Sequence, residues 1–470
     1  MTRKIVASIL LATLCAAGAK KDPRTMRFPL TLEFTPQNVE RFTLSNGIQV
    51  FFSEDHELPL VDIDFLVKTG ENRVAPKESG LSDLLCDLVV EGGSKKVPKR
   101  AFEDSLQKVG ATFRSEAGNE SSRYNLHLLA SSVPALLPLV AGAIREPALP
   151  KSQIELNKRQ YLTAYMSRNS EPEEIASRAF YKLLYGKESP RSREITPSSL
   201  ELITRKAMQE YHAANYRPSL FMIGVSGDFD PKVMLELLEQ CFGDWKEPEK
   251  EPSLPYPLIS NSSGPGVYFI QWPGAVQSAI WLGHLGILAS DPQYPEALML
   301  SEVYGTSRTS RINMTIREQY GLSYSPYGWI SSGYTAPGSF AALCLTKSTS
   351  TIKATRLILG IIRDLKKEGI KEAELVQAKE SWLATFPAYY EDPRQILSSR
   401  MNYAAFGFPV DFWDKMPAKI EPLSRESVSA FAERFLEPDS LIILILGDST
   451  GLDGNVSEFG KVVVIDPEVY

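Results

Sequence analysis

The chain has 470 residues, which is more than one hydrophobic core usually supports, so we expect at least two domains. Hydrophobic residues make up 43% of the chain and charged residues 23%, and both proportions are ordinary for a soluble globular protein. The formal net charge of −6 gives no reason to expect nucleic acid as a partner.

The first residues have the pattern of a secretory signal peptide. Arg3 and Lys4 come before an apolar run at residues 5–14, and small residues occupy positions 17–19, directly before Lys20. We therefore predict that residues 1–19 are a signal peptide and that the mature protein is periplasmic or secreted.

Cys15 leaves a lipoprotein as an alternative, although the bulky Leu14 beside it is a poor residue for lipobox cleavage. The apolar run is too short for a transmembrane anchor, which needs about 20 apolar residues, and we expect no membrane span later in the chain. The mature chain has an odd number of widely separated cysteines, so we expect buried thiols rather than disulfides: Cys86, Cys241 and Cys344.

Hydrophobic patterning predicts an α+β fold. An Asn46-Gly47 turn between two alternating stretches indicates a β-hairpin. The predicted strands are residues 39–44, 48–52, 60–67, 123–129 and 220–226. The predicted helices are residues 80–93, 98–109, 134–144, 151–166, 172–185 and 202–216.

The chain reads as a tandem duplication of two similar halves. Residues 216–220 lead into a strand that ends at Gly227-Asp228, and residues 436–440 lead into one that ends at Gly447-Asp448, 220 positions later. Between the halves, residues 246–265 are rich in proline and polar residues, which is typical of a linker.

The stretch GLSDLLCDLVVEGG, residues 80–93, carries the main functional signal. Asp83, Cys86 and Asp87 are expected to project together from one side of its helix. This is the frame in which H-x-x-E-H holds a zinc ion and a general base, but here it reads D-x-x-C-D. The apolar residues follow helical spacing and predict a buried opposite face: Leu81, Leu84, Leu85, Leu88 and Val89.

These features together resemble the pitrilysin/insulinase zinc metallopeptidases, in particular the shorter branch that includes the mitochondrial processing peptidase. The resemblance runs from about Val39 to Asp448. Residues 310–324, with Ser310-Arg311, Arg317-Glu318 and Gly321-Leu322-Ser323-Tyr324, are similar to the family's S-R-L…R-E…G-L-A-Y signature. The resemblance implies two α/β-sandwich halves, at residues 30–245 and 266–470, joined by the proline-rich linker.

The same resemblance argues against catalysis by this chain. It places Asp83 and Asp87 where active members have zinc-binding histidines, and Cys86 where they have the general base. The position of the third ligand, a glutamate, falls around Thr163 and Ala164, where no carboxylate is present. No two of the four histidines lie within one helical turn of each other: His56, His127, His212 and His284. We therefore expect no zinc in this chain.

Two further site predictions follow from the resemblance. Arg114 and Ser115 stand where the family's substrate-binding strand usually has an Asn-Ala pair. In the second half, Arg317 and Tyr324 match residues that hydrogen-bond the substrate backbone. The competing interpretation is that Arg317 pairs with a neighbouring acid and that Tyr324 starts an ordinary strand.

These observations predict a catalytically inactive subunit that binds unfolded peptides for an active, zinc-bearing homologue, in a heterodimer. Two alternatives stay open: an active metallopeptidase with unusual ligands, and a scaffold homologue without peptide binding. The sequence does not decide between a homo-oligomer and a hetero-oligomer, nor whether Asp83, Cys86 and Asp87 bind any metal.

Overall fold

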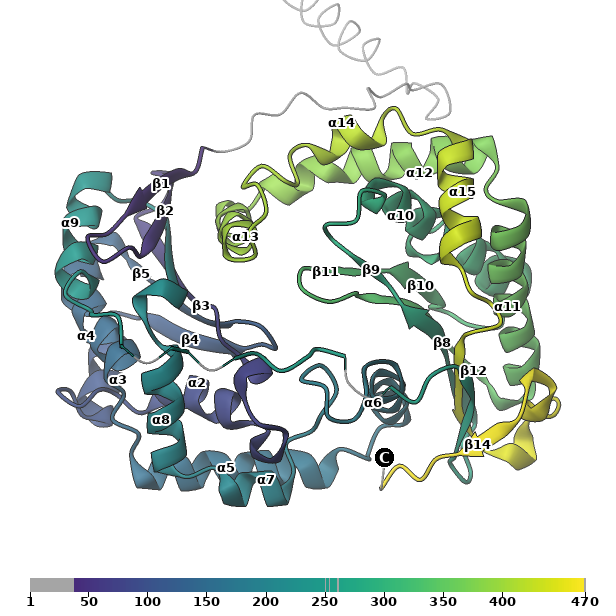
Figure 1. Cartoon of the computed structure of the whole chain (residues 1–470), viewed down its shortest axis with the longest axis horizontal. Coiled ribbons are helices and arrows are strands. Elements are labelled where there is room, and N and C mark those ends of the chain that lie inside the picture. Colours follow the sequence, from purple (N-terminus) through teal and green to yellow (C-terminus); the bar gives the residue numbers. More distant parts are fainter. Residues whose placement is uncertain (1–37, 250, 253, 260–261, 469–470) are drawn as a thin grey trace, which may run out of the picture.

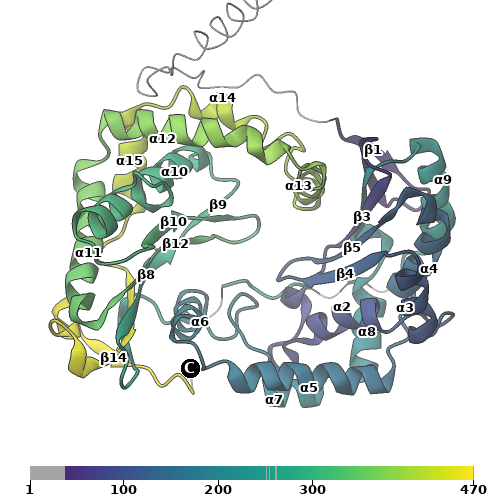
Figure 2. The same cartoon turned by 180° about the vertical axis from the view of Figure 1, so that it is seen from behind.

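The computed structural model describes residues 38–468 except 250, 253, 260 and 261. The predicted signal peptide, with Cys15, lies outside the described residues. Two six-stranded sheets, each flanked by helices, form two lobes that face each other (Figures 1 and 2). Within the described ranges, no helix combines the length and apolar character needed to cross a membrane.

The first sheet has the strand order β1-β2-β6-β3-β5-β4. Its β1–β2 hairpin turns at Asn46-Gly47 as predicted, with Gly47 in the left-handed region at φ 90° and Thr43 opposite Gln49. Strand β4 stands at one edge of this sheet. The strands are β1 (Glu40–Thr43), β2 (Gln49–Glu54), β3 (Leu60–Val67), β4 (Thr112–Ala117), β5 (Ser122–Leu129) and β6 (Phe221–Gly227).

The second sheet has the order β10-β12-β8-β13-β7-β14. A separate parallel pair, β9 (Ile287–Leu288) and β11 (Ser332–Gly333), lies beside it. The strands of the larger sheet are β7 (Gly266–Gln271), β8 (Gln277–Leu285), β10 (Tyr327–Ile330), β12 (Ser339–Lys347), β13 (Ile442–Gly447) and β14 (Val462–Val464).

The predicted duplication is confirmed. Helices α4 (Val133–Arg145) and α11 (Thr351–Glu368) begin 218 positions apart, and each follows a short 3₁₀ turn after the equivalent strand. Helices α8 (Arg205–Asn215) and α15 (Arg425–Phe435) begin 220 positions apart. The described residues between 246 and 265 form neither helix nor strand, and β7 begins directly after them.

One predicted helix boundary was wrong. Residues 202–216 were predicted as one helix, but α7 ends at Leu202 and α8 begins at Arg205. The side chain of Thr204 accepts a hydrogen bond from the Ala207 amide, so it caps a new helix at this point. The other helices of the first half are α2 (Leu81–Glu91), α3 (Lys99–Lys108), α5 (Lys151–Ser167), α6 (Pro172–Tyr185), α7 (Pro197–Leu202) and α9 (Pro231–Phe242).

In the second half, two segments are π-helical, Glu302–Thr306 and Asn313–Gln319. The remaining helices of this half are α10 (Tyr294–Ser301), α12 (Glu372–Thr385), α13 (Pro393–Ala405) and α14 (Met416–Ile420). A short 3₁₀ helix, Phe386–Tyr390, joins α12 to the stretch before α13.

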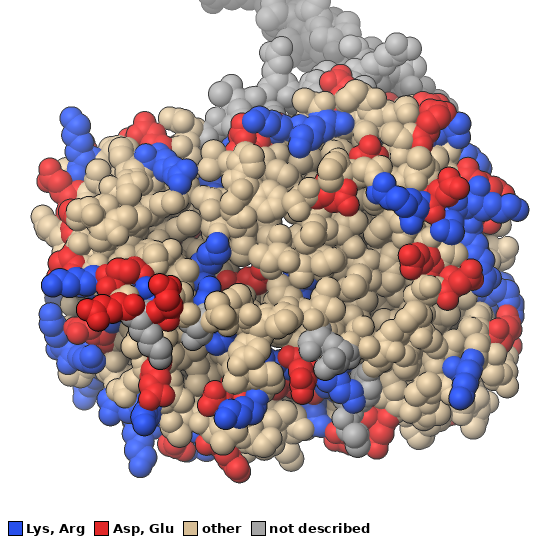
Figure 3. All heavy atoms as spheres, in the orientation of Figure 1, with Lys and Arg blue, Asp and Glu red and all other residues tan. Residues whose placement is uncertain are grey.

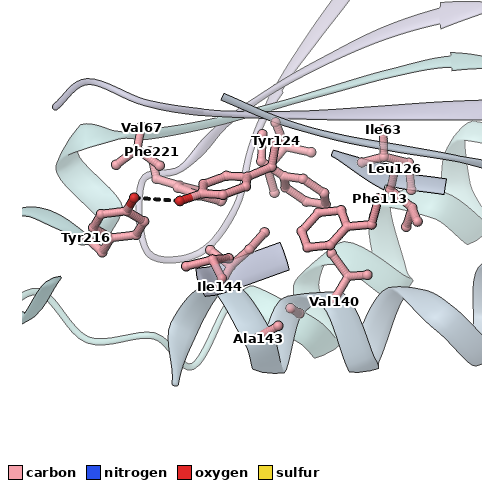
Figure 4. Packing of buried hydrophobic residues seen from close by; sticks show 14 of the residues in the cluster. Ile63, Val67, Phe113, Tyr124, Leu126, Val140, Ala143, Ile144, Tyr216 and Phe221 are labelled. Atoms are coloured by element: carbon pink, nitrogen blue, oxygen red, sulfur yellow. Dashed lines mark hydrogen bonds between the residues drawn. The ribbon is translucent and has the colours of Figure 1, made fainter. Parts of the chain in front are cut away.

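The outer core of the first half lies between its sheet and helices α2, α4 and α9. Figure 4 shows Ile144 and Val140 of α4 beneath the aromatic side chains of β4 and β5. The hydroxyl groups of Tyr124 and Tyr216 hydrogen-bond to each other at 2.6 Å, which satisfies both polar atoms inside this core.

The inner faces of the two sheets are covered by an exchange of helices. Helix α13 belongs to the second half by sequence, but its Leu397 and Met401 pack on Phe51 and Leu66 of the first sheet. Helix α6 belongs to the first half, and its Phe180 packs on Trp281 of the second sheet with ring centroids 5.0 Å apart. Each sheet therefore buries apolar surface against a helix from the other half.

We predict that neither half folds alone. A chain of residues 20–255 lacks α13, so the inner apolar face of its sheet would stay exposed, and we expect aggregation or binding of a hydrophobic dye. Co-expression with residues 256–470 should restore a soluble one-to-one complex in size-exclusion chromatography. A monomeric first half that unfolds in one cooperative transition would contradict this prediction.

Candidate functional site

Helix α2 carries the D-x-x-C-D frame, and a buried ion pair fixes its start. Arg193 Nε lies 2.8 Å from Glu71 Oε1, and both side chains are buried. Ser79 and Ser82 also donate hydrogen bonds to the Glu71 carboxylate, each at 2.8 Å. Removing either charge would leave the other buried without a counter-charge, so this pair ties the start of α2 to the loop that contains Arg193.

Cys86 lies beside the two aspartates of the frame, but it is buried more deeply than either of them. Its side chain is fully buried in the core of the first half, and its Sγ lies 4.0 Å from the carbonyl oxygen of Arg123. Burial raises the pKa of the Cys86 thiol to about 12, so the thiol is neutral and does not act as a base at neutral pH. A cysteine at the border of an amphipathic helix follows the apolar side because the neutral thiol packs as a small hydrophobe.

Asp87 is occupied by hydrogen bonds from two other elements. The hydroxyl of Tyr161 on α5 donates to Asp87 Oδ2 at 2.8 Å, and Ser115 on β4 donates to Oδ1 at 3.3 Å. Burial raises the pKa of Asp87, while these hydroxyl donors oppose that shift. The carboxylate therefore ties α2 to its neighbours.

Asp83 is the less well satisfied of the two aspartates. The Ser82 hydroxyl, whose single proton is shared with Glu71, lies 3.1 Å from Asp83 Oδ2. Burial, and secondly the charge of Glu71, raise the pKa of Asp83 to about 6. Asp83 also lines a cavity of about 370 Å³ together with Glu71, Asn119, Arg178 and Arg193.

The stretch predicted to contain the third zinc ligand lies on α5 and contacts α2 through the side chain of Tyr161. Tyr161 reaches Asp87, whereas Thr163 and Ala164 are exposed to solvent. One helical turn apart on the same side of α5, Gln153 and Asn157 donate hydrogen bonds to Glu91 at 2.8 and 2.9 Å. These two hydrogen bonds were not predicted from the sequence, although the spacing of four between the polar residues indicates that they share one helix face.

These residues do not fit a catalytic zinc ion, which needs three protein ligands and a base beside an open position. Asp87 is engaged by Tyr161, Cys86 points into the core, and no histidine lies on α2. Across the described residues, no group of three or more His, Cys, Asp and Glu side chains is placed to hold a metal. His127, for example, hydrogen-bonds Asp62 at 3.0 Å on neighbouring strands.

The second predicted site brings its two residues together. Arg317 lies in the π-helical segment Asn313–Gln319, and its guanidinium carbon is 4.8 Å from the ring centroid of Tyr324. Tyr324 is 81% exposed and precedes β10, so it does not start that strand. Arg317 also meets Glu318 at 3.4 Å, but that glutamate is more than half exposed, and such a pair contributes little stability.

Comparisons with known proteins identify the family. Residues 49–197 match the family model described as insulinase (peptidase family M16), and residues 202–381 match the one described as peptidase M16 inactive domain. The chain belongs to the insulinase (M16) peptidase family. The inactive-domain model covers the second-half site, and the peptidase model covers α2 with its altered frame.

Two curated M16 relatives carry different descriptions. The "uncharacterized zinc protease YmxG" of Bacillus subtilis is 21% identical over 87% of this chain and 98% of its own length. The "non-peptidase homolog YmxG" of Helicobacter pylori is also 21% identical, over 85% of this chain and 92% of its own. Relatives of this chain are thus described both as a zinc protease and as a non-peptidase homolog.

Two solved structures share the M16 fold. A peptidase M16 inactive domain from Pseudomonas fluorescens superposes with a TM-score of 0.76 at 22% identity, over 88% of this chain and 98% of that one. The periplasmic protease PqqL of Escherichia coli superposes with a TM-score of 0.74 at 14% identity, over 94% of this chain and 50% of that one.

The raised pKa of Asp83 predicts how stability depends on pH. The folded protein holds this proton up to about pH 6, whereas the ordinary value for the group is 3.8, so stability is lost as pH rises through that window. We expect Asp83→Asn to raise the free energy of unfolding by about 1–3 kcal/mol at neutral pH, with the gain vanishing near about pH 4.

Urea unfolding at a series of pH values measures this effect. The matched control is Asp104→Asn, which changes an aspartate on α3 whose side chain is 69% exposed and should leave stability nearly unchanged. A destabilised Asp83→Asn variant at neutral pH would show that the charged carboxylate is needed where it stands.

Proposed function

We propose that this chain is a non-catalytic M16 subunit that binds unfolded peptides and positions them for an active, zinc-bearing homologue in the periplasm. The observation that carries the proposal is the chemistry of α2. The two aspartates of the D-x-x-C-D frame are held by hydroxyl groups of the protein, and the third group is a buried thiol. A helix of this kind keeps its structural role without offering a general base.

The descriptions of related proteins also support a non-catalytic, periplasmic role. One curated homologue is described as a non-peptidase, and one solved neighbour is described as an inactive domain. Two observations support the periplasmic location. Residues 1–19 have a signal-peptide pattern, and PqqL, which has a similar fold, is described as a periplasmic protease.

Peptide binding is proposed for the surface around Arg317 and Tyr324. Tyr324 and Tyr327 are both exposed, at 81% and 44%, close to a cationic side chain that stacks on one of them. Large aromatic side chains and arginine are the residues that supply most binding energy in protein interfaces. The contribution to catalysis would be orientation of the peptide over a zinc ion held by the partner.

On the face shown in Figure 3, acidic and basic side chains are mixed, and uncharged residues cover much of the middle. A surface of this kind suits peptides of varied charge better than a polyanion. Two other functions compete with the proposal. An active enzyme would need Asp83 or Asp87 as a metal ligand, and a scaffold would leave Arg317 and Tyr324 without a ligand.

We predict that the purified chain alone binds less than one equivalent of zinc and cleaves no unstructured peptide. Replacing Asp83, Cys86 and Asp87 by His, Glu and His should not restore cleavage, because no carboxylate stands at the third-ligand position. Metal analysis by mass spectrometry and a fluorogenic peptide assay measure the two outcomes. Stoichiometric zinc in the unmodified chain, lost in Asp83→Ala or Asp87→Ala, would favour the active-enzyme alternative.

We predict that Arg317→Ala lowers the kcat/KM of the active partner by roughly ten- to a hundredfold, because a charge-assisted hydrogen bond to the peptide backbone is lost. Tyr324→Phe should cost less, since it removes one neutral hydroxyl bond. Each variant is co-expressed with the partner, and size exclusion confirms that the complex persists before cleavage is measured.

The matched control is Arg363→Ala, which removes an exposed arginine from α11 in the same half and should leave cleavage unchanged. If an intact complex with Arg317→Ala has the same kcat/KM as the wild-type complex, Arg317 does not contribute to peptide binding in this half. The scaffold alternative would then be preferred.

A further inference from the structure

An aromatic cavity of about 230 Å³ lies in the second half, and none of its lining residues belongs to the two sites described above. Its walls come from α10, from the turn after β11, from α13 and from the segments on either side of α13. Six aromatic side chains line it: Tyr294, Tyr334, Tyr389, Tyr403, Phe412 and Trp413. The remaining lining residues are small and uncharged, so no charged side chain lines the cavity.

The rings are held in place by their neighbours. Tyr334 stacks on Phe406 with centroids 4.8 Å apart and an interplanar angle of 6°. Phe412 lies 5.5 Å from Tyr403 and 5.9 Å from Tyr294, measured between centroids. Such contacts fix the rotamers of the wall, so the cavity is formed before any ligand arrives.

The hydroxyl groups of Tyr294, Tyr334 and Tyr403 stay neutral at physiological pH. Burial raises the pKa of Tyr334 to about 12, and it also raises the pKa of Tyr294 and Tyr403. Tyr389 hydrogen-bonds Ser399 on α13. The cavity therefore offers ring edges and faces with neutral hydroxyl groups, which suits an uncharged aromatic group in an edge-to-face arrangement.

The size of the cavity limits what it can hold. Sites for drug-sized molecules occupy about 300–1,000 Å³, so this cavity is suited to a single side chain rather than a whole cofactor. Aromatic rings also attract cations, but a buried cation would need a nearby carboxylate, and neither Asp nor Glu lines the cavity.

The cavity also lies where a peptide between the lobes can reach it. Tyr334 is followed by Thr335, whose hydroxyl donates to Glu120 of the first half. The Pro337 carbonyl accepts a hydrogen bond from Arg191 of the first half at 2.7 Å. The segment that carries Tyr334 is therefore at the junction of the halves, and β9 and β11 point toward the centre of the molecule in both views (Figures 1 and 2).

We propose that this cavity is a subsite for one aromatic side chain of the bound peptide, so that the protein selects unfolded peptides that contain phenylalanine or tyrosine. The proposal rests on the proposed peptide-binding function, which it deepens by naming a substrate class. The preference for an aromatic side chain comes from burial of its ring against the aromatic walls of the cavity. An alanine at the same peptide position would not fill the cavity, and water would occupy it instead.

The test uses the full-length mature protein and unstructured peptides that differ at one central position, Phe, Ala or Lys. We expect the Phe peptide to bind about tenfold or more tightly than the Ala peptide in fluorescence anisotropy. Ala289→Leu fills the cavity from its buried wall and should abolish that difference. Ala388→Leu, at an exposed position of the neighbouring 3₁₀ helix, is the matched control and should preserve it.

Equal binding of the Phe and Ala peptides by the wild-type protein would overturn the proposal, as would a preference that survives in Ala289→Leu. Tighter binding of the Lys peptide would assign the cavity to a cation instead.

If no peptide binds, the peptide-binding function itself fails, and N-acetyl-phenylalaninamide then tests the cavity directly by saturation-transfer NMR. Saturation transfer to the ring protons in wild type and Ala388→Leu, lost in Ala289→Leu, would keep the cavity as an aromatic site. If the wild-type protein shows no saturation transfer to the ring protons, the cavity is not an aromatic site either.

Discussion

The architecture depends on the exchange of helices α6 and α13 between the two halves. Each inner sheet face carries apolar residues that water would otherwise contact, and each is covered by a helix whose sequence belongs to the other half. Glycine permits the close approach: a side chain at Gly224 would meet Leu397 and Met401 of α13, and one at Gly283 would meet Phe180 of α6. The halves are thereby fixed relative to each other, and with them the surface around Arg317 and the aromatic cavity.

Within this architecture, helix α2 carries the D-x-x-C-D frame and is held by contacts on both of its sides. The apolar side of α2 packs the core, and its polar side bonds to α5 and β4 through Asp87 and Glu91. Hydroxyl and amide donors from Ser115, Tyr161 and Asn157 satisfy carboxylates that face them. These packing and hydrogen-bonding contacts hold α2 in place without a bound metal ion.

Local patterns predicted most helices and strands of the first half, whereas few elements of the second half were predicted. Helical spacing was enough to predict α2 and its buried leucines, and the repeated strand entry predicted the duplication. The full burial of Cys86 was not predicted, because its helix position borders the apolar face and its burial depends on the side chains packed around it. The exchange of α6 and α13, the Arg193–Glu71 pair and the aromatic cavity all join residues far apart in sequence, so no local pattern indicates them.

The central claim is that this chain acts beside an active homologue rather than alone. Purification of the tagged protein from its native host at its natural expression level, followed by mass spectrometry and metal analysis of the complex, tests it most directly. The account predicts a one-to-one complex with an M16 protein that carries H-x-x-E-H, and one zinc ion per pair. A protein recovered alone or only with copies of itself, with one zinc ion per chain, would contradict it.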